Sequence, residues 1–174
     1  MDGKWNGNIK EYNIGDELIF EGVYLNGERN GEGKKYYNKQ LIFEGEYLNN
    51  KRWKGNGKEY GYNGHLIYEG EYLNGERNGN GIEYYYNGNI LYDGECKNGN
   101  WSGIGYVFYK NGKIKYDGEF LDGKWNGKGK EYFQDGKIKF DGDFLNGNRN
   151  NDKNDGIIPE WYNYQESKHF KWYK

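Results

Sequence analysis

Few side chains in this sequence are of the kind that carries out covalent chemistry. His65 and His169 are its only imidazoles, and Cys96 is its only thiol. A nucleophilic cysteine needs an adjacent base, and the sequence supplies none beside Cys96. We interpret His65, which follows an Asn-Gly pair, as an exposed turn residue, and Cys96 as a buried substitute for an aromatic ring. We therefore predict a protein that is not an enzyme, with no catalytic residues and no cofactor.

Carboxylates are numerous and come in pairs two residues apart. Glu44 and Glu46, for example, flank Gly45 and would point to the same side of a strand. Such a pair could bind a metal ion or a basic partner. Lysines recur nearby, however, and solvated carboxylates balanced by lysines are the simpler interpretation, so no metal site is predicted.

Arginine and tryptophan recur at one position, seven residues after each of a series of regularly spaced glycines. These residue types dominate the hot spots of protein interfaces, so this row is our main candidate for an interaction surface. A ladder of Arg and Trp that joins adjacent turns is an equally good interpretation. The candidate interface residues are Trp5, Arg29, Trp53 (beside Arg52), Arg77, Trp101, Trp125 and Arg149, with Trp161, Phe170 and Trp172 near the C-terminus.

A repeat of about 24 residues must position these side chains. Its central glycine is flanked two residues away on each side by aromatic residues, with Cys96 in one of these places, and directly by carboxylates. Residues two apart share a face of a strand. One face would therefore carry ring, glycine and ring, with the glycine leaving room for rings to lie over the backbone. These columns are Phe20, Gly22, Tyr24, Phe43, Gly45, Tyr47, Tyr68, Gly70, Tyr72, Tyr92, Gly94, Tyr116, Gly118, Phe120, Phe140, Gly142 and Phe144.

Turn signals divide each unit into two strands. An Asn-Gly or Asp-Gly pair, such as Asn74-Gly75, follows the first strand, and a second such pair, such as Asn87-Gly88, ends the second strand. These dipeptides between β-type runs are strong hairpin signals. A trial register places Glu46 opposite Lys58 and Glu119 opposite Lys130, with each ring that follows the central glycine opposite another glycine.

The predicted fold is all-β: an elongated, twisted single antiparallel sheet of stacked β-hairpins, with the rings on a concave side. At about 4.8 Å per strand, the sheet would be about 60–70 Å long. Stability would be a sum of nearest-neighbour contacts. The 30 glycines argue against long helices, and the 20% aromatic content argues against disorder.

The segment from Tyr68 to Gly81, YEGEYLNGERNGNG, resembles the MORN (membrane occupation and recognition nexus) repeat, as does the segment from Tyr116 to Gly129. The chain is also similar to the variant MORN-like repeats of bacterial antitoxin-type proteins. The resemblance implies stacked hairpins and scaffolding, tethering or dimerisation roles, and phospholipid binding has been proposed for some members. The family often has His before the second glycine, where this chain has Asn78 or Asn126.

We expect residues 1–156 to form the repeat array, a half repeat and six units, and residues 157–174 to form an aromatic and basic C-terminal cap or tail. The N-terminus reads as repeat from the start, either as a natural half-unit cap or as a fragment boundary. No apolar run is long enough for a transmembrane helix.

We expect a cytoplasmic scaffold or tether, peripheral to a membrane or the cytoskeleton at most. Its partner would be another protein or a second copy, reached through the terminal strands or the C-terminal tail. A peripheral, phosphoinositide-binding membrane module is one alternative, and a module that binds sugars or cations on its aromatic face is another. A net charge of −2 disfavours anionic membranes and gives no reason to expect nucleic acid.

Overall fold

The computed structural model describes residues 3–61 and 64–150. They form one open sheet of thirteen antiparallel strands, in which every strand pairs with its neighbours in the sequence. The fold is all-β, as predicted. No helix that could span a membrane occurs in this part of the chain. The strands are β1 (Gly7–Tyr12), β2 (Leu18–Leu25), β3 (Glu28–Tyr37), β4 (Gln40–Leu48), β5 (Lys51–Tyr60), β6 (Leu66–Leu73), β7 (Glu76–Tyr84), β8 (Ile90–Lys97), β9 (Asn100–Phe108), β10 (Ile114–Leu121), β11 (Lys124–Tyr132), β12 (Ile138–Leu145) and β13 (Asn148–Arg149).

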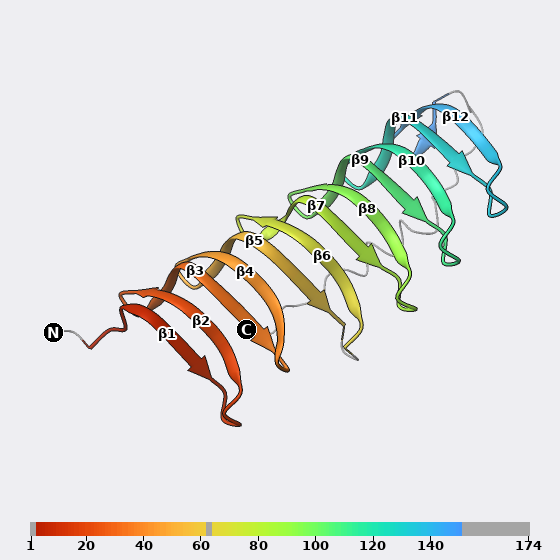
Figure 1. The fold of residues 1–174 in the computed structure, drawn as a ribbon. Coiled ribbons are helices and arrows are strands. Elements are labelled where there is room, and N and C mark those ends of the chain that lie inside the picture. The colour runs from red at the N-terminus through yellow and green to blue at the C-terminus, as the bar shows by residue number, and fades with distance from the viewer. Residues whose placement is uncertain (1–2, 62–63, 151–174) are drawn as a thin grey trace.

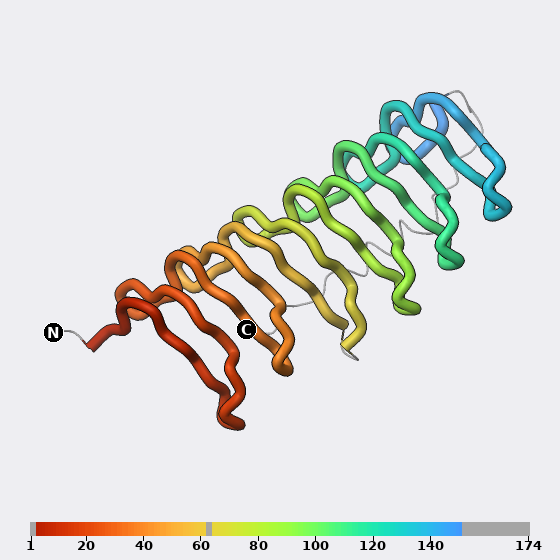
Figure 2. Tube along the Cα trace, viewed as in Figure 1, coloured from red at the N-terminus to blue at the C-terminus, as the bar shows by residue number. Residues whose placement is uncertain are grey.

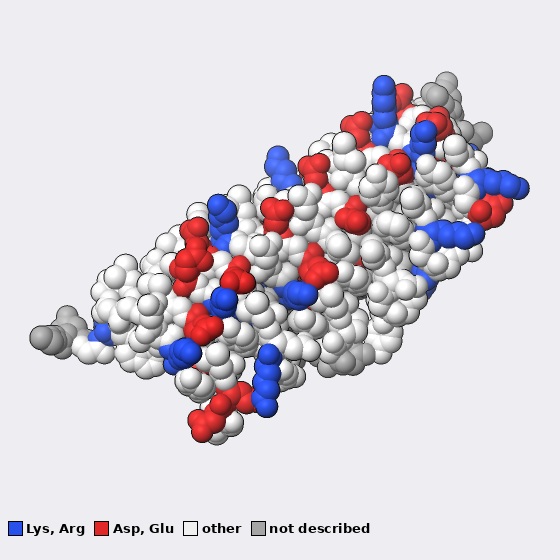
Figure 3. All heavy atoms as spheres, in the orientation of Figure 1, with Lys and Arg blue, Asp and Glu red and all other residues white. Residues whose placement is uncertain are grey.

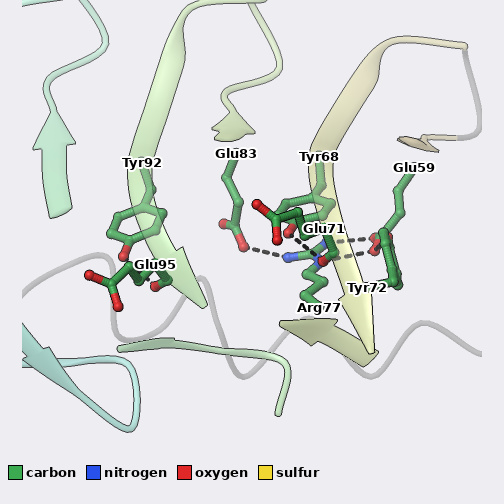
Figure 4. Close-up of polar contacts among 8 residues, drawn as sticks. All are labelled: Glu59, Tyr68, Glu71, Tyr72, Arg77, Glu83, Tyr92 and Glu95. Atoms are coloured by element: carbon green, nitrogen blue, oxygen red, sulfur yellow. Dashed lines mark hydrogen bonds and ion pairs between the residues drawn. The ribbon is translucent and has the colours of Figure 1, made fainter. Parts of the chain in front are cut away.

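The sheet is long and strongly curved. Each strand bends as an arch, and the arches follow one another along a gently twisting axis (Figures 1 and 2). Acidic and basic side chains are spread over the outside of the arches among uncharged surface (Figure 3). The aromatic columns lie inside them, as Figure 4 shows for Tyr68 and Tyr72. We call these two surfaces the outer face and the inner face.

The core of this one-layer sheet is a continuous row of rings on the inner face. The rings at the two predicted positions are almost all fully buried, and Cys96 is buried in the same row; Phe140, in the last hairpin, is only partly buried. Rings of neighbouring hairpins meet edge to face, for example Phe20 with Tyr47 at a centroid distance of 5.1 Å. Such contacts pass from hairpin to hairpin, so each unit is stabilised mainly by the next one.

Glycine is required where these rings cross the backbone. A Cβ atom at Gly33 would lie 2.6 Å from Cζ of Phe20, and one at Gly129 would lie 2.5 Å from Cζ of Tyr116. Both distances are far below van der Waals contact. This confirms the prediction that the missing side chain makes room for a ring.

The two turns of a unit are of different types except between β3 and β4, where the two central residues, Asn38 and Lys39, both have positive φ as in the first turns. At the first turns, which follow the strand that carries the central glycine, both central residues have positive φ. Asn26 (55°) and Gly27 (85°) are an example, and this is the type I′ geometry that Asn-Gly favours. The other second turns are longer. In the turn after Tyr85, the Tyr85 amide donates to the Asn89 carbonyl and the Gly88 amide donates to the Tyr85 carbonyl. There only the glycine takes positive φ, as in a three-residue hairpin loop.

The trial register is wrong. Glu46 lies opposite Lys54, not Lys58, and Lys130 lies opposite Asp117, not Glu119. The rings that follow the central glycine do face glycines, but on the preceding strand, as Tyr47 faces Gly31. The reason is a β-bulge after the central glycine in the β2–β3, β6–β7, β8–β9 and β10–β11 pairs, which shifts the strands relative to each other.

The unit between Gly45 and Gly70 is one residue longer than most, and its pairing differs. Elsewhere one glycine of the second strand faces the central glycines of both neighbours, as Gly81 faces Gly70 and Gly94. In β5 this role is divided between Gly55 and Gly57, which face Gly45 and Gly70 respectively. The expected boundary between residues 156 and 157 lies outside the described residues.

Candidate interaction surfaces

The Arg and Trp row, our main candidate, lies on the inner face as plates stacked on rings. In each unit the side chain seven or so residues after the central glycine folds back over the ring that precedes this glycine. Trp125 stacks on Tyr116 with a centroid distance of 4.2 Å and an interplanar angle of 7°. Arg77 takes the equivalent place, with Cζ 4.1 Å from the centroid of Tyr68. The other plates are Arg29 over Phe20, Arg52 over Phe43, Trp101 over Tyr92 and Arg149 over Phe140.

Arginine plates also bind carboxylates that project from the second strands. Arg77 donates from Nε and Nη2 to Glu59 and from Nη1 to Glu83, so that one guanidinium joins strands β5 and β7 (Figure 4). Arg29 binds Glu11 in the same way, with Nε 2.7 Å and Nη2 2.8 Å from the two carboxylate oxygens. These fork-to-fork hydrogen bonds are charge-assisted and geometrically specific.

Burial and pairing act in opposite directions on these groups. Burial lowers the pKa of Arg29 and of Arg77, but their carboxylate partners raise both above the ordinary arginine value. Burial likewise raises the pKa of Glu11, and the hydrogen bonds from Arg29 and Tyr24 bring it below its usual value. The Arg29–Glu11 pair is therefore ionised inside the arch at neutral pH.

Charge is absent from the inner face between Trp101 and Trp125. The position that holds Glu59 or Glu83 in other strands is occupied by Val107, which is 1% exposed. Both plates beside it are tryptophans. Arginines that stack on rings thus occur together with carboxylates, whereas the two stacked tryptophans lie on either side of the apolar Val107.

The backbone of the same row joins successive hairpins. The turn amide of Gly99 donates to the carbonyl of Arg77 at 3.0 Å, and that of Gly123 donates to the carbonyl of Trp101 at 2.8 Å. This geometry agrees with the alternative interpretation of the row, a ladder that joins adjacent turns. The two exceptions are Trp5, which is 57% exposed, and Trp53, which is 38% exposed while Arg52 takes the stacking place. Trp161, Phe170 and Trp172 lie outside the described residues.

Sequence reasoning missed the carboxylates that the arginines bind. Glu11, Glu59, Glu83 and Glu131 all follow directly after the outward-pointing residue of a second strand. The signal that could have found them is internal covariation. Acid and arginine recur 18 residues apart, as in Glu11 with Arg29, Glu59 with Arg77 and Glu131 with Arg149.

The outer face carries a second, more exposed row of charges across the strands. At the N-terminal end lysines and glutamates alternate, with Lys10–Glu21 at 3.5 Å and Lys34–Glu44 at 2.9 Å, and β5 and β6 contribute Lys58–Glu69 at 2.8 Å. Lys58 and the hydroxyl of Tyr84 lower the pKa of Glu69. The hydroxyl of Tyr36, followed by Lys10, lowers the pKa of Glu21. We call this row the outer ladder.

The side chains considered for chemistry stand apart from one another. Cys96 is buried in the ring row. His65 follows a turn, as expected, but it is half-buried and not exposed, because it packs against Tyr86 at a centroid distance of 4.6 Å. Among the described residues, no three His, Cys, Asp or Glu side chains are grouped so that they could hold a metal ion.

Comparison with known families agrees with this geometry. The MORN repeat family profile matches residues 20–41, 68–90 and 116–138. Each match begins at the ring before a central glycine and spans one hairpin of the sheet. The chain therefore contains MORN repeats. A comparison with curated proteins found no match.

Proposed function

We propose that this chain is a non-enzymatic scaffold that binds another protein along its elongated sheet. The observation that carries the proposal is the continuity of the sheet. Thirteen strands pair only with their neighbours in sequence, so residues at equivalent positions form rows that run the length of the array. A surface of this kind offers many regularly spaced anchor points for a protein partner.

The stacked Arg and Trp side chains of the inner face, which we call the inner ladder, support this role by making the surface stiff. Plates stack on rings within a unit, guanidinium groups join second strands, and turn amides join hairpin tips. A partner that binds such a preformed surface loses little free energy to ordering the scaffold. MORN repeats occur in scaffolds that contact proteins or membranes, and the net charge of −2 favours a protein over an anionic membrane.

Three measurements on the full chain test the proposal. Affinity capture should recover a discrete protein that binds the purified chain in a reconstituted mixture. Sedimentation with vesicles that contain anionic lipid should leave the chain in the supernatant, whereas a membrane module would co-sediment and be released by salt. Titration with sugars and quaternary ammonium ions should leave tryptophan fluorescence unchanged. Vesicle or small-ligand binding without a protein partner would contradict the proposal.

Self-association is the second form that this function could take. Strand β1 pairs on one edge with β2, and no described strand covers its other edge. Open strand edges are templates for pairing with a second chain. Light scattering of the purified chain over a range of concentrations tests this. Asn8→Pro, which removes a backbone amide that faces the open edge, should weaken any dimer that uses this edge.

A further inference from the structure

The outer ladder is interrupted over the middle of the sheet. Successive residues of the row are Glu69, Ile82, Asp93, Tyr106, Asp117 and Lys130, each opposite the next in the pairing of β6 to β11. Ile82 and Tyr106 stand where Lys10, Lys34, Lys58 and Lys130 stand in the other second strands. Two lysines are thus replaced by apolar or aromatic side chains in consecutive units.

Where these lysines are missing, two carboxylates have no ion pair among the described residues. Neither Asp93 nor Asp117 makes an ion pair or a side-chain hydrogen bond with the described residues. Lys130, which lies opposite Asp117, has its ammonium group 3.4 Å from Asp141 instead. The tyrosine hydroxyl that binds Glu21 and Glu69 is also missing near Asp93, because Phe108 replaces the tyrosine.

Exposed apolar surface lies between the two aspartates. Ile104 is 60% exposed and Tyr106 is 39% exposed, and the ring of Tyr106 lies beside that of Phe108. In Figure 3 carboxylates separated by uncharged surface occupy the middle of this face, whereas acidic and basic side chains alternate towards the N-terminal end. We call the group of Ile82, Asp93, Ile104, Tyr106 and Asp117 the central outer patch.

The patch has the spacing of a site for a helix that crosses the strands. A shallow hollow on the outer face runs across the strands from Ile42 through Lys58 and Glu69 and ends at Ile82 and Asp93, the edge of the patch. Asp93 and Asp117 are two strands apart, which is about 10 Å. Residues i and i+7 of a helix are about 10.5 Å apart on one side. In an extended strand, residues on one face are about 7 or 13 Å apart, and the middle of a sheet has no free edge to which a strand could pair.

We propose that the central outer patch binds a basic amphipathic helix of a partner protein. Two Lys or Arg side chains two turns apart would pair with Asp93 and Asp117, and the apolar side chains between them would cover Ile104 and Tyr106. Charge complementarity selects this occupant over an anionic lipid surface or a nucleic acid. The proposal rests on the scaffold function and names the class of partner and the place where it binds.

The test measures binding of a fluorescein-labelled 14-residue amphipathic helix made of leucine and lysine to the full chain by fluorescence anisotropy. A peptide of the same composition in scrambled order is the comparison peptide. We expect the amphipathic peptide to bind more tightly and its affinity to fall with salt. No binding, or equal binding of the scrambled peptide, would overturn the proposal.

Two variants locate the site. Ile82→Lys/Tyr106→Lys restores the lysines of the outer ladder and should weaken binding about tenfold or more. Asp93→Asn/Asp117→Asn makes the same change of net charge with exposed, nearly isosteric residues, so it keeps the test valid if the first variant folds poorly. Glu17→Gln/Glu21→Gln is the matched control, since it also raises the net charge by two but at acids that already pair with lysines near the N-terminal end of the sheet; it should bind almost as the unchanged chain does.

Two results would place the occupant elsewhere. Equal weakening by the control would show that net charge alone drives binding, and a dimer that Asp93→Asn/Asp117→Asn dissociates would make a second copy the occupant. Either would overturn the inference. If the chain captures a protein regardless of Asp93 and Asp117, the scaffold function stands and the inference fails. If it captures no protein at all, the scaffold function itself fails.

Discussion

Two neighbouring stretches of the inner face solve one structural problem with different chemistry. In the β6–β7 hairpin the plate over Tyr68 is Arg77, which binds Glu59 and Glu83. From β9 to β11 the plates are Trp101 and Trp125, with Val107 between them. The distances from plate to ring are almost the same, 4.1 Å for Arg77 and 4.2 Å for Trp125.

The comparison separates the features that the fold requires in every unit from those that differ between units. The fold requires a flat side chain that covers the ring and closes the inner face, and both guanidinium and indole meet this requirement. A charged side chain at this position needs an oppositely charged partner nearby, because an unpaired charge inside the arch is costly. Changes that keep the plate but disturb the balance should therefore be the most damaging.

Arg77→Trp gives the sharpest test of this balance. The substitution keeps a flat plate over Tyr68 but withdraws the guanidinium from Glu59 and Glu83. We expect a loss of about 3–5 kcal/mol in the free energy of unfolding, measured by urea denaturation followed by circular dichroism. Adding Glu59→Gln and Glu83→Gln should recover most of the loss, because neutral amides need no cation. An Arg77→Trp variant as stable as the parent would show that the ion pairs contribute nothing.

The converse change places a charge where the inner face is apolar. Val107→Glu introduces a carboxylate between Trp101 and Trp125 at a site that is 1% exposed. We expect a loss of about 2–4 kcal/mol, the cost of burying a polar group without a partner. Trp125→Arg added to Val107→Glu should restore part of the stability by rebuilding the arrangement around Arg77. If the double variant is less stable than Val107→Glu alone, the two chemistries are not interchangeable.

A glycine substitution tests the feature that both stretches share. Gly129→Ala would place a Cβ 2.5 Å from Cζ of Tyr116, so the ring must move away from Trp125. We expect a loss of about 1–3 kcal/mol from overpacking, together with a change in the fluorescence of the tryptophans. Gly112→Ala is the control: it has positive φ but no atom within 4 Å of the added Cβ, and it should cost about 1 kcal/mol from backbone strain alone. Equal losses would remove the ring contact as the explanation.

Much of the fold was predictable because its signals repeat. The period, the ring columns and the Asn-Gly or Asp-Gly turns recur along the chain with little variation, so the pattern is not explained by chance. The strand register could not be predicted, since a bulge near Gly79, Gly103 or Gly127 adds two residues to one strand without changing the composition. These glycines have positive φ, but a glycine in a sequence does not show whether it is in a turn, a bulge or a close contact.

The inner ladder was harder to predict than the rings. Arg and Trp follow the turn directly, so they were expected at an edge, yet the bulge turns them back onto the inner face. Their candidacy as a partner surface remains a prediction that the structure does not test, although Trp101 and Trp125 are buried. The central outer patch was visible in the sequence as Ile82 and Tyr106 in a lysine column, but only the correct register places Asp93 and Asp117 beside them.

One position breaks the charge rule and should be improvable. Lys35 occupies the inner position that Glu11 or Glu59 holds elsewhere, between Arg29 and Arg52. Lys35→Glu would replace a group of three cations by an acid next to arginines. We expect a gain of about 1 kcal/mol in the free energy of unfolding, measured in low salt, and a smaller gain in high salt. Lys35→Gln should give an intermediate value, and a loss of stability with Glu would contradict the rule.

The smallest effect expected is the pH dependence of the same site. Burial lowers the pKa of Lys35, and the charges of Arg52 and Arg29 lower it further below its usual value of 10.5. The unfolded chain therefore holds the proton more tightly than the folded chain. Linkage then requires that stability due to this group rises with pH between the folded pKa and 10.5. Tyrosines with raised pKa, such as Tyr47 at about 12, act in the opposite direction in the parent and in any variant alike. The informative quantity is thus the difference in unfolding free energy between the parent and Lys35→Gln. This difference should become smaller as pH rises towards 10.5. A difference independent of pH would show that the ammonium group of Lys35 is not disfavoured by its two arginine neighbours.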